Sequence, residues 1–198
     1  MKSITCTCDN IIEADFKDRY DAEKDDNLLE SILEGDFLSV TCGECGKLLK
    51  PEIPVRITGK NPPLDIYFVP EKERDAVLSG KKAFPDADRL VVGYPELEEK
   101  VLAAVSGLDD RAVEVLKFYL LNKIDEEAEV NIYLHEIKNE DLRFRIHGLK
   151  QNEIGIVPVD RKLYDKVLSQ IDELEKSEDL GEVLTPPYVS IHKIYLGE

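Results

Sequence analysis

Cysteine is scarce in this sequence, and every cysteine lies near the start of the chain. The 198 residues contain four cysteines, all within the first 45 positions. Two other features are missing altogether. No run approaches the roughly 18 apolar residues that a membrane span needs, and the N-terminal residues lack the apolar stretch of a secretory signal. These absences exclude a membrane protein from the expected classes and predict a cytoplasmic one.

Basic side chains are also in short supply. The chain has 26 lysines and arginines against 42 acidic residues, a formal charge of −16. Such an excess of negative charge repels a phosphate backbone and disfavours nucleic acid as a partner. Hydrophobic residues make up 42% of the chain, which is enough to bury a core and excludes a wholly disordered protein.

The sequence lacks the common catalytic motifs. It has no GxSxG, no phosphate-binding glycine loop, no GxGxxG and no HExxH. Its three histidines, at positions 135, 147 and 192, lie far from the cysteines in sequence. An enzyme with its site in a cleft between domains stays an alternative, with Glu136 or Glu153 as candidate acids. No base paired with a nucleophile can be named.

The cysteines form two close pairs, Cys6 with Cys8 and Cys42 with Cys45. An even number, close pairing and a cytoplasmic setting favour metal binding over a disulfide framework. Four thiolates bind zinc at about 2.3 Å in a tetrahedron, and two tight turns lying side by side can supply them. The sequence therefore predicts a structural zinc ion, because four thiolates leave no open position for a water nucleophile.

The two pairs differ in spacing. The second is a CxxC turn flanked by glycines, of which Gly46 can take a positive φ after the last ligand. The first is CxC, and in an extended strand its two side chains would lie about 7 Å apart. Both can reach one ion only if the backbone curls at Thr7. Asp9 could instead supply an oxygen ligand in place of Cys8.

Two other interpretations of the cysteines stay open: a degenerate site that has lost its metal, and thiols that form a disulfide or switch on oxidation. In thioredoxin-like proteins a CxxC opens a helix, whose N-terminus lowers the thiol pKa. Here Pro51 stops a helix before its second turn. The local pattern is typical of a strand, a turn and a strand, and structural metal is the favoured interpretation.

Residues 4–70 resemble the CpXC family, an uncharacterised bacterial and archaeal group with two Cys-Pro-x-Cys pairs presumed to bind metal. Thr7 and Gly43 stand near the place of the family's prolines, and the first pair is one residue short. The resemblance implies a metal-binding domain and brings no known activity. Besides the cysteines, it rests on the order of these segments: a strand at 11–16, a helix at 27–34, Gly35-Asp36-Phe37, Pro51-Glu52-Ile53-Pro54 and 65–70.

Apolar periodicity predicts an α+β protein with two domains, residues 1–80 and 81–198. The first would be zinc-ribbon-like with an inserted short helix, capped by Asn27 with Glu30 and closed by Gly35. The second would have two helices, an antiparallel sheet and a further helix. The remaining expected elements are a strand at 64–69, a helix from Pro70 to Gly80, a strand at 89–93, helices that begin at Pro95 and after Asp109, strands at 130–137, 142–147 and 154–159, a helix from Asp160 to Leu174, and a final strand at 188–196.

The register of the expected sheet decides what its histidines can do. A two-residue turn at residues 139 and 140 would pair His135 with Phe144 and His147 with Ile132. The two histidines would then lie on opposite faces and could not share a metal or a proton relay. His135 would join an apolar face as a satisfied core histidine.

These features together predict a zinc-stabilised protein that acts by binding another protein, as an adaptor. Its acidity favours a basic partner. The alternatives are an enzyme and a nucleic-acid-binding zinc ribbon. Residues 1–70 carry 8 basic and 14 acidic side chains, so charge disfavours nucleic acid even for this region.

Overall fold

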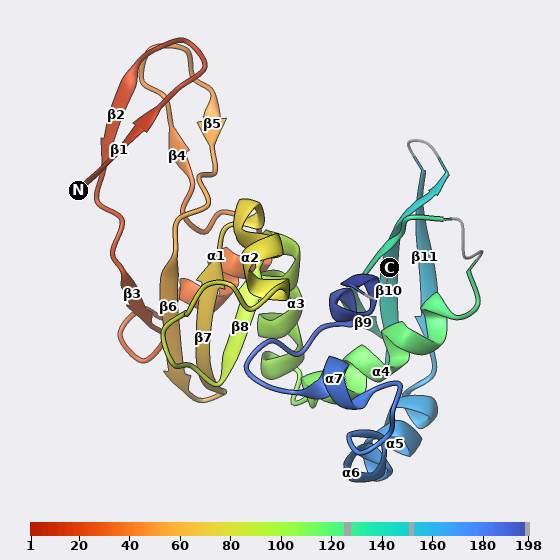
Figure 1. Cartoon of the computed structure of the whole chain (residues 1–198). Coiled ribbons are helices and arrows are strands. Elements are labelled where there is room, and N and C mark those ends of the chain that lie inside the picture. Colours follow the sequence, from red (N-terminus) through yellow and green to blue (C-terminus); the bar gives the residue numbers. More distant parts are fainter. Residues whose placement is uncertain (125–127, 151–152, 197–198) are drawn as a thin grey trace. The chain divides into compact units, whose positions relative to one another are not determined.

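The computed structural model describes residues 1–124, 128–150 and 153–196, and its mixed α+β character confirms the predicted fold class. The chain divides into two compact units, Met1–Glu98 and Glu99–Glu198 (Figure 1). The first unit extends beyond the boundary that the sequence suggests at residue 80. The reason is that β8 (Arg89–Val92) pairs with β7 (Pro63–Val69) and completes the sheet of that unit.

The first unit is built around a four-stranded sheet in the order β3-β6-β7-β8. β6 (Val55–Lys60) and β7 form an antiparallel hairpin, while β3 (Arg19–Asp21) and β8 run parallel to their neighbours. Alternate residues of the hairpin are buried, as expected for a sheet with one covered face. These are Val55, Ile57, Ile66 and Phe68.

Four helical segments accompany this sheet: α1 (Leu28–Leu33), η1 (Glu71–Glu73), α2 (Arg74–Leu78) and the start of α3 (Gly93–Val105). Gly35 and Gly80 adopt positive φ and close α1 and α2 as expected. The predicted capping box is not formed. The Asn27 side chain makes no cap bond, and its backbone N–H donates instead to Asp25 Oδ1 at 3.2 Å.

Two short hairpins extend from one end of this sheet (Figure 1). β1 (Lys2–Thr5) pairs with β2 (Ile11–Ala14), and β4 (Val40–Thr41) pairs with β5 (Leu48–Leu49), both antiparallel. Each hairpin stands as a separate two-stranded sheet. Isolated two-stranded hairpins are marginally stable at best, so this part of the unit depends on contacts between their turns.

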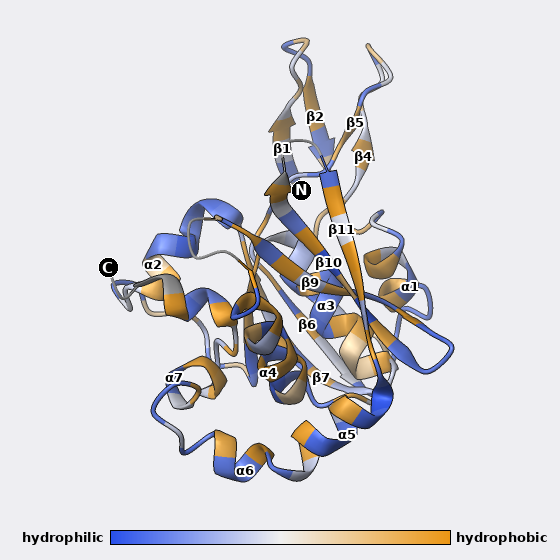
Figure 2. Cartoon of the chain, turned by 90° about the vertical axis from the view of Figure 1, so that its right-hand side faces the viewer, coloured by the Kyte–Doolittle hydropathy of each residue, from blue (hydrophilic) through white to orange (hydrophobic). Residues whose placement is uncertain are grey.

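The second unit packs helices on one face of an antiparallel meander, β9 (Asn131–Lys138), β10 (Asp141–Lys150) and β11 (Glu153–Val159). Hydrophobic and hydrophilic residues alternate along β10 and β11 (Figure 2). The core lies between this sheet and α4. The helices are α4 (Asp110–Leu121), α5 (Arg161–Ser169), α6 (Ile171–Leu174), α7 (Gly181–Leu184) and η2 (Ile191–Leu196).

Two helix starts in this unit follow the prediction. The Asp109 carboxylate accepts from the backbone N–H of Arg111, and the Asp160 carboxylate accepts from that of Lys162. The single helix expected up to Leu174 is interrupted at Gln170, where α5 ends and α6 begins.

The final strand expected at 188–196 is wrong, because Ile191–Leu196 form the 3₁₀ helix η2. Tyr188 to His192 are all buried, so the segment does not show the alternating exposure of a half-buried strand. The Ser190 hydroxyl accepts from the backbone N–H of His192 at 3.2 Å. Such local side-chain bonds compete with strand pairing, and here they start the 3₁₀ turn.

The predicted register of β9 with β10 holds near the turn and then fails. Ile137 pairs with Leu142 as expected, but an irregularity follows, and Phe144 faces Leu134 instead of His135. His135 is the extra residue of β9 at this irregularity, and it has no partner in the register with β10. His135 is therefore exposed, and its expected place in the core is wrong.

Among the described residues, no helix has the length and apolar character that crossing a membrane requires.

Candidate metal centre

The two cysteine pairs lie in the turns that connect the strands of the two short hairpins. In the first turn the backbone N–H of Cys6 donates to Asn10 O, and that of Asp9 donates to Cys6 O. In the second, the N–H of Cys42 donates to the Lys47 carbonyl, and that of Gly46 donates back to the Cys42 carbonyl. The two turns thus share one hydrogen-bond pattern, and the first is one residue shorter.

The residue after the last cysteine of each turn has a left-handed backbone. Gly46 has φ +71°, as its position predicts, and Asp9 has φ +65° in the equivalent place. Asp tolerates this conformation better than most residues. The chain therefore curls within the CxC segment, as convergence of Cys6 and Cys8 requires. Asp9 serves the turn by its backbone, and its carboxylate is not among the clustered ligand atoms.

All four sulfurs lie within 4.8 Å of one another. Cys6 Sγ is 3.6 Å from Cys45 Sγ, and Cys8 Sγ is 3.7 Å from Cys42 Sγ. Sulfurs held 2.3 Å from one ion in a tetrahedron would be about 3.8 Å apart. The observed separations are far longer than the roughly 2.0 Å of a disulfide bond. Donor type and spacing both fit a metal ion bound by four thiolates.

Hydrogen bonds to sulfur favour the thiolate at two of these positions. The Asn10 side-chain amide donates to Cys42 Sγ at 3.5 Å. This bond, with backbone N–H groups of the second turn, lowers the pKa of Cys42 to about 6. The backbone N–H of Cys8 lowers the pKa of Cys6. A thiolate is the form of cysteine that binds a metal.

Cys8 shows the opposite effect. The backbone N–H of Asn10 favours its thiolate, but the neighbouring sulfurs of Cys45 and Cys6 raise the pKa of Cys8 to about 12. Closely spaced sulfurs cannot all ionise without compensating positive charge. A divalent cation bound among the four sulfurs would supply that charge.

Apolar side chains are exposed beside these turns. Ile11, three residues after Cys8, is 64% exposed, and Leu48, three residues after Cys45, is 58% exposed. The hairpins are too small to bury them. Lys47 Nζ donates to Thr7 Oγ1 at 3.1 Å and joins the two turns.

A buried charged network in the second unit was not foreseen from the sequence. Lys117 and Glu114 on α4 lie within the broad apolar stripe that predicts a core helix, and both are almost fully buried. Lys117 Nζ donates to Glu99 Oε1 at 2.7 Å and to Glu114 Oε1 at 3.0 Å. The width of the apolar stripe could have indicated this network, because polar residues that lie within such a wide stripe are buried with it.

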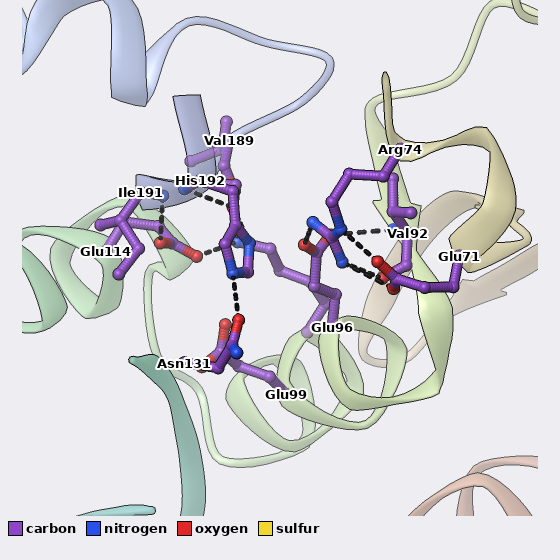
Figure 3. A network of polar contacts seen from close by, with 12 residues as sticks. Glu71, Arg74, Val92, Glu96, Glu99, Glu114, Asn131, Val189, Ile191 and His192 are labelled. Carbon is purple, nitrogen blue, oxygen red and sulfur yellow. Dashed lines mark hydrogen bonds and ion pairs between the residues drawn. The ribbon is translucent and has the colours of Figure 1, made fainter. Parts of the chain in front are cut away.

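The network links α3, α4, β9 and the C-terminal segment. Lys100 Nζ donates to Glu114 and to Val189 O, at 3.0 and 2.9 Å. Glu114 Oε2 accepts from the Ile191 N–H (Figure 3). Glu99 Oε2 accepts from the N–H of Leu134. Each buried charged side chain thus contacts a side chain of opposite charge. Each also has a further partner, either a backbone group or a second charged side chain, and such pairing makes buried charges tolerable.

Burial shapes the ionisation of this network. Desolvation raises the pKa of Glu99 to about 7. Burial opposes the charge of Lys117, but the carboxylates of Glu114 and Glu99 raise the pKa of this lysine. Lys100 and Lys117 overcome the burial of Glu114 and lower its pKa. The groups are enclosed, and their contacts serve the fold.

The structure brings one histidine near a hydroxyl. Ser190 Oγ lies 3.1 Å from His192 Nδ1, and His192 Nε2 lies 3.1 Å from Asn131 Oδ1 (Figure 3). Ser190 is 1% exposed, so a substrate cannot approach its oxygen as nucleophilic attack requires. The arrangement anchors η2 to β9. His147 lies on β10 and stacks edge-on near Tyr133.

The acids named as enzyme candidates lie on the same meander. Glu136 on β9 faces Arg143, with the two charged groups 3.6 Å apart. Glu153 begins β11 and is exposed. In the first unit the buried carboxylate of Glu96 accepts from Arg74, which also bonds Glu71 (Figure 3).

Comparison with known proteins gives a family and a relative. The model of the CpXC protein family matches residues 4–117, which is more than half of the chain. An uncharacterized protein of Treponema pallidum (strain Nichols) is 23% identical over 217 aligned positions, covering 98% of this chain and 97% of the relative. No solved structure matches the chain.

Proposed function

The chain belongs to the CpXC family, and on that premise we propose that Cys6, Cys8, Cys42 and Cys45 bind a structural zinc ion. The observation that carries the proposal is the convergence of four sulfurs within 4.8 Å from two turns. The two hairpins then form a zinc-ribbon-like module in which the ion replaces the apolar core that these strands are too short to build.

Zinc fits this donor set for two reasons. Four thiolates in a tetrahedral arrangement are typical of zinc or iron–sulfur sites, and an isolated four-cysteine site of two turns is typical of structural zinc. Four protein ligands complete the coordination, so the ion holds the hairpins together and offers no position to a substrate. The chain's part is to orient sulfur through the Asn10 amide and the backbone N–H groups of the turns.

Metal analysis tests this proposal. The purified protein is expected to hold about one zinc ion per chain, and removal by a chelator should lower its melting temperature. Cys42→Ser should abolish zinc binding. Thr7→Ser is the control: it lies in the first turn and keeps the hydroxyl, so zinc binding should be unchanged. An unchanged melting curve after verified metal removal would contradict the proposal.

We further propose that the protein acts in the cytoplasm by binding another protein, with the zinc-bound hairpins as its contact surface. Ile11 and Leu48 support this role, since two large apolar side chains remain exposed beside the cysteine turns. The charge of −16 favours a basic partner, and reduced thiols are maintained in the cytoplasm.

Affinity capture from the cells that express the protein tests the contact surface. The double variant Ile11→Asp and Leu48→Asp should keep its metal and lose its specific partner. Leu163→Asp, at a 40% exposed position of α5 in the second unit, is the matched control and should retain the partner. Equal capture by the double variant and the control would count against the hairpins as the contact surface.

A further inference from the structure

Each contact between the two hairpins' sulfurs joins one buried and one exposed cysteine. Cys6 is buried and lies 3.6 Å from the exposed Cys45. Cys42 is buried and lies 3.7 Å from the exposed Cys8. An oxidant in solvent therefore meets Cys8 or Cys45 first, and the buried thiol beside each belongs to the other hairpin.

We propose that a peroxide converts the four thiols into two disulfides that join the hairpins, Cys6–Cys45 and Cys8–Cys42, and so releases the metal. The metal release rests on the proposed zinc site, whereas the pairing of the thiols does not. The structural link between the hairpins then passes from the ion to covalent bonds.

The chemistry balances with hydrogen peroxide as the oxidant. In the metal-loaded protein the cysteines are thiolates, so each reacting sulfur is matched by one proton from solvent. The exposed thiolate attacks the peroxide and cleaves its O–O bond, which with one proton gives a sulfenic acid and one water. The buried thiolate then attacks the sulfenic sulfur, forms the S–S bond and, with a second proton, expels a second water. Each disulfide reduces one peroxide by two electrons, so four thiols consume two peroxide molecules and leave no sulfur to hold the ion.

The pairing decides what oxidation does to the fold. Disulfides within a turn would leave the hairpins unlinked once the metal is gone. The Cys6–Cys45 disulfide joins residues that are 39 positions apart, and the Cys8–Cys42 disulfide joins residues that are 34 positions apart. Both close loops that constrain the unfolded chain. The hairpins thus stay together, while roughly two negative charges of a zinc tetrathiolate disappear from the tip. A partner bound at Ile11 and Leu48 would meet a different charge beside them.

Peroxide titration of the metal-loaded protein, with a zinc-binding dye and peptide mapping, tests the inference. Tryptic cleavage puts Cys6 and Cys8 in one peptide, residues 3–17, and the other two cysteines in residues 25–47. Disulfides between the turns join these peptides, and disulfides within the turns leave them separate. Fragmentation of the joined peptides in the spectrometer then distinguishes Cys6–Cys45 from Cys6–Cys42.

The expected result is joined peptides with the stated pairing, release of the bound zinc, and a melting temperature several degrees above that of the reduced, metal-free protein. A chelator without peroxide should release the zinc and leave four free thiols. Separate peptides, or sulfinic acids without disulfides, overturn the inference and do not affect the proposal that the reduced protein binds zinc. Protein purified without metal refutes the zinc proposal, and the same digest then still tests the pairing.

Discussion

Replacing the buried lysine of α4 tests the charged network of the second unit most directly. In Lys117→Met the two carboxylates that share the ammonium group, Glu99 at 2.7 Å and Glu114 at 3.0 Å, lose it together. Both are about 1% exposed, so water cannot replace the lost bonds. Breaking a buried ion pair by removing one partner costs about 3–5 kcal/mol. Methionine fills a similar volume, so little of this loss comes from a cavity.

Urea unfolding followed by tyrosine fluorescence measures the effect, since the chain has eight tyrosines and no tryptophan. Lys123→Met is the matched control, because this lysine is exposed just beyond the end of the same helix. We expect the control to change the free energy of unfolding by less than about 0.5 kcal/mol.

A second substitution separates loss of charge from loss of packing. Glu114 keeps its ion pair with Lys100 at 3.0 Å in Lys117→Met, so Glu99 is the carboxylate that loses its cation. Adding Glu99→Gln removes that charge, and the double variant should therefore be more stable than Lys117→Met alone. The two residues are in contact and their effects should not add. A loss below about 1 kcal/mol for Lys117→Met, or no recovery in the double variant, would refute the claim that the network is buried and coupled.

Three further predictions follow from named contacts. Burial raises the pKa of Glu99 to about 7, so the stability that its protonated form contributes is present below pH 4.5 and is lost as pH rises through 7. In urea unfolding, Glu99→Gln should therefore reduce the change in the free energy of unfolding between pH 5 and 8 by about 2 to 3 kcal/mol. Asp109→Ala removes the cap of α4 and should cost about 1 kcal/mol in thermal unfolding. Gly148→Ala places a Cβ 2.1 Å from the Glu129 carbonyl oxygen at φ +92° and should cost at least about 2 kcal/mol, whereas Gly107→Ala, at φ +64° in open space, should cost about half as much.

The features that the sequence predicts correctly depend on interactions between residues close in sequence. Asp109 and Asp160 cap their helices because a carboxylate needs only the N–H groups of the next turn. Gly46 reverses the second cysteine turn because its φ depends on no distant contact. The sequence predicts that the cysteines converge because their even number and close pairing favour metal binding, and two turns lying side by side can present four sulfurs together.

The features that the sequence predicts wrongly depend on contacts between residues far apart in sequence. The exposure of His135 depends on one irregularity in β9, after which Leu134 takes the place opposite Phe144. A shift of one residue exchanges the two faces of a strand. The segment after Tyr188 is rich in β-branched residues, yet the Ile191 N–H donates to the buried Glu114, and tertiary context outweighs strand propensity.

The shortened first pair illustrates how a local turn and a distant contact combine. A CxC segment in a strand would separate its sulfurs, but the bond from the Asp9 N–H to the Cys6 carbonyl closes a turn at φ +65°. That turn also places Asn10 where its amide reaches Cys42 in the other hairpin. Loss of one residue therefore tightens the turn without removing a sulfur from the cluster. Because each hairpin is a two-stranded sheet of its own, the end of the first unit depends on contacts between the two cysteine turns.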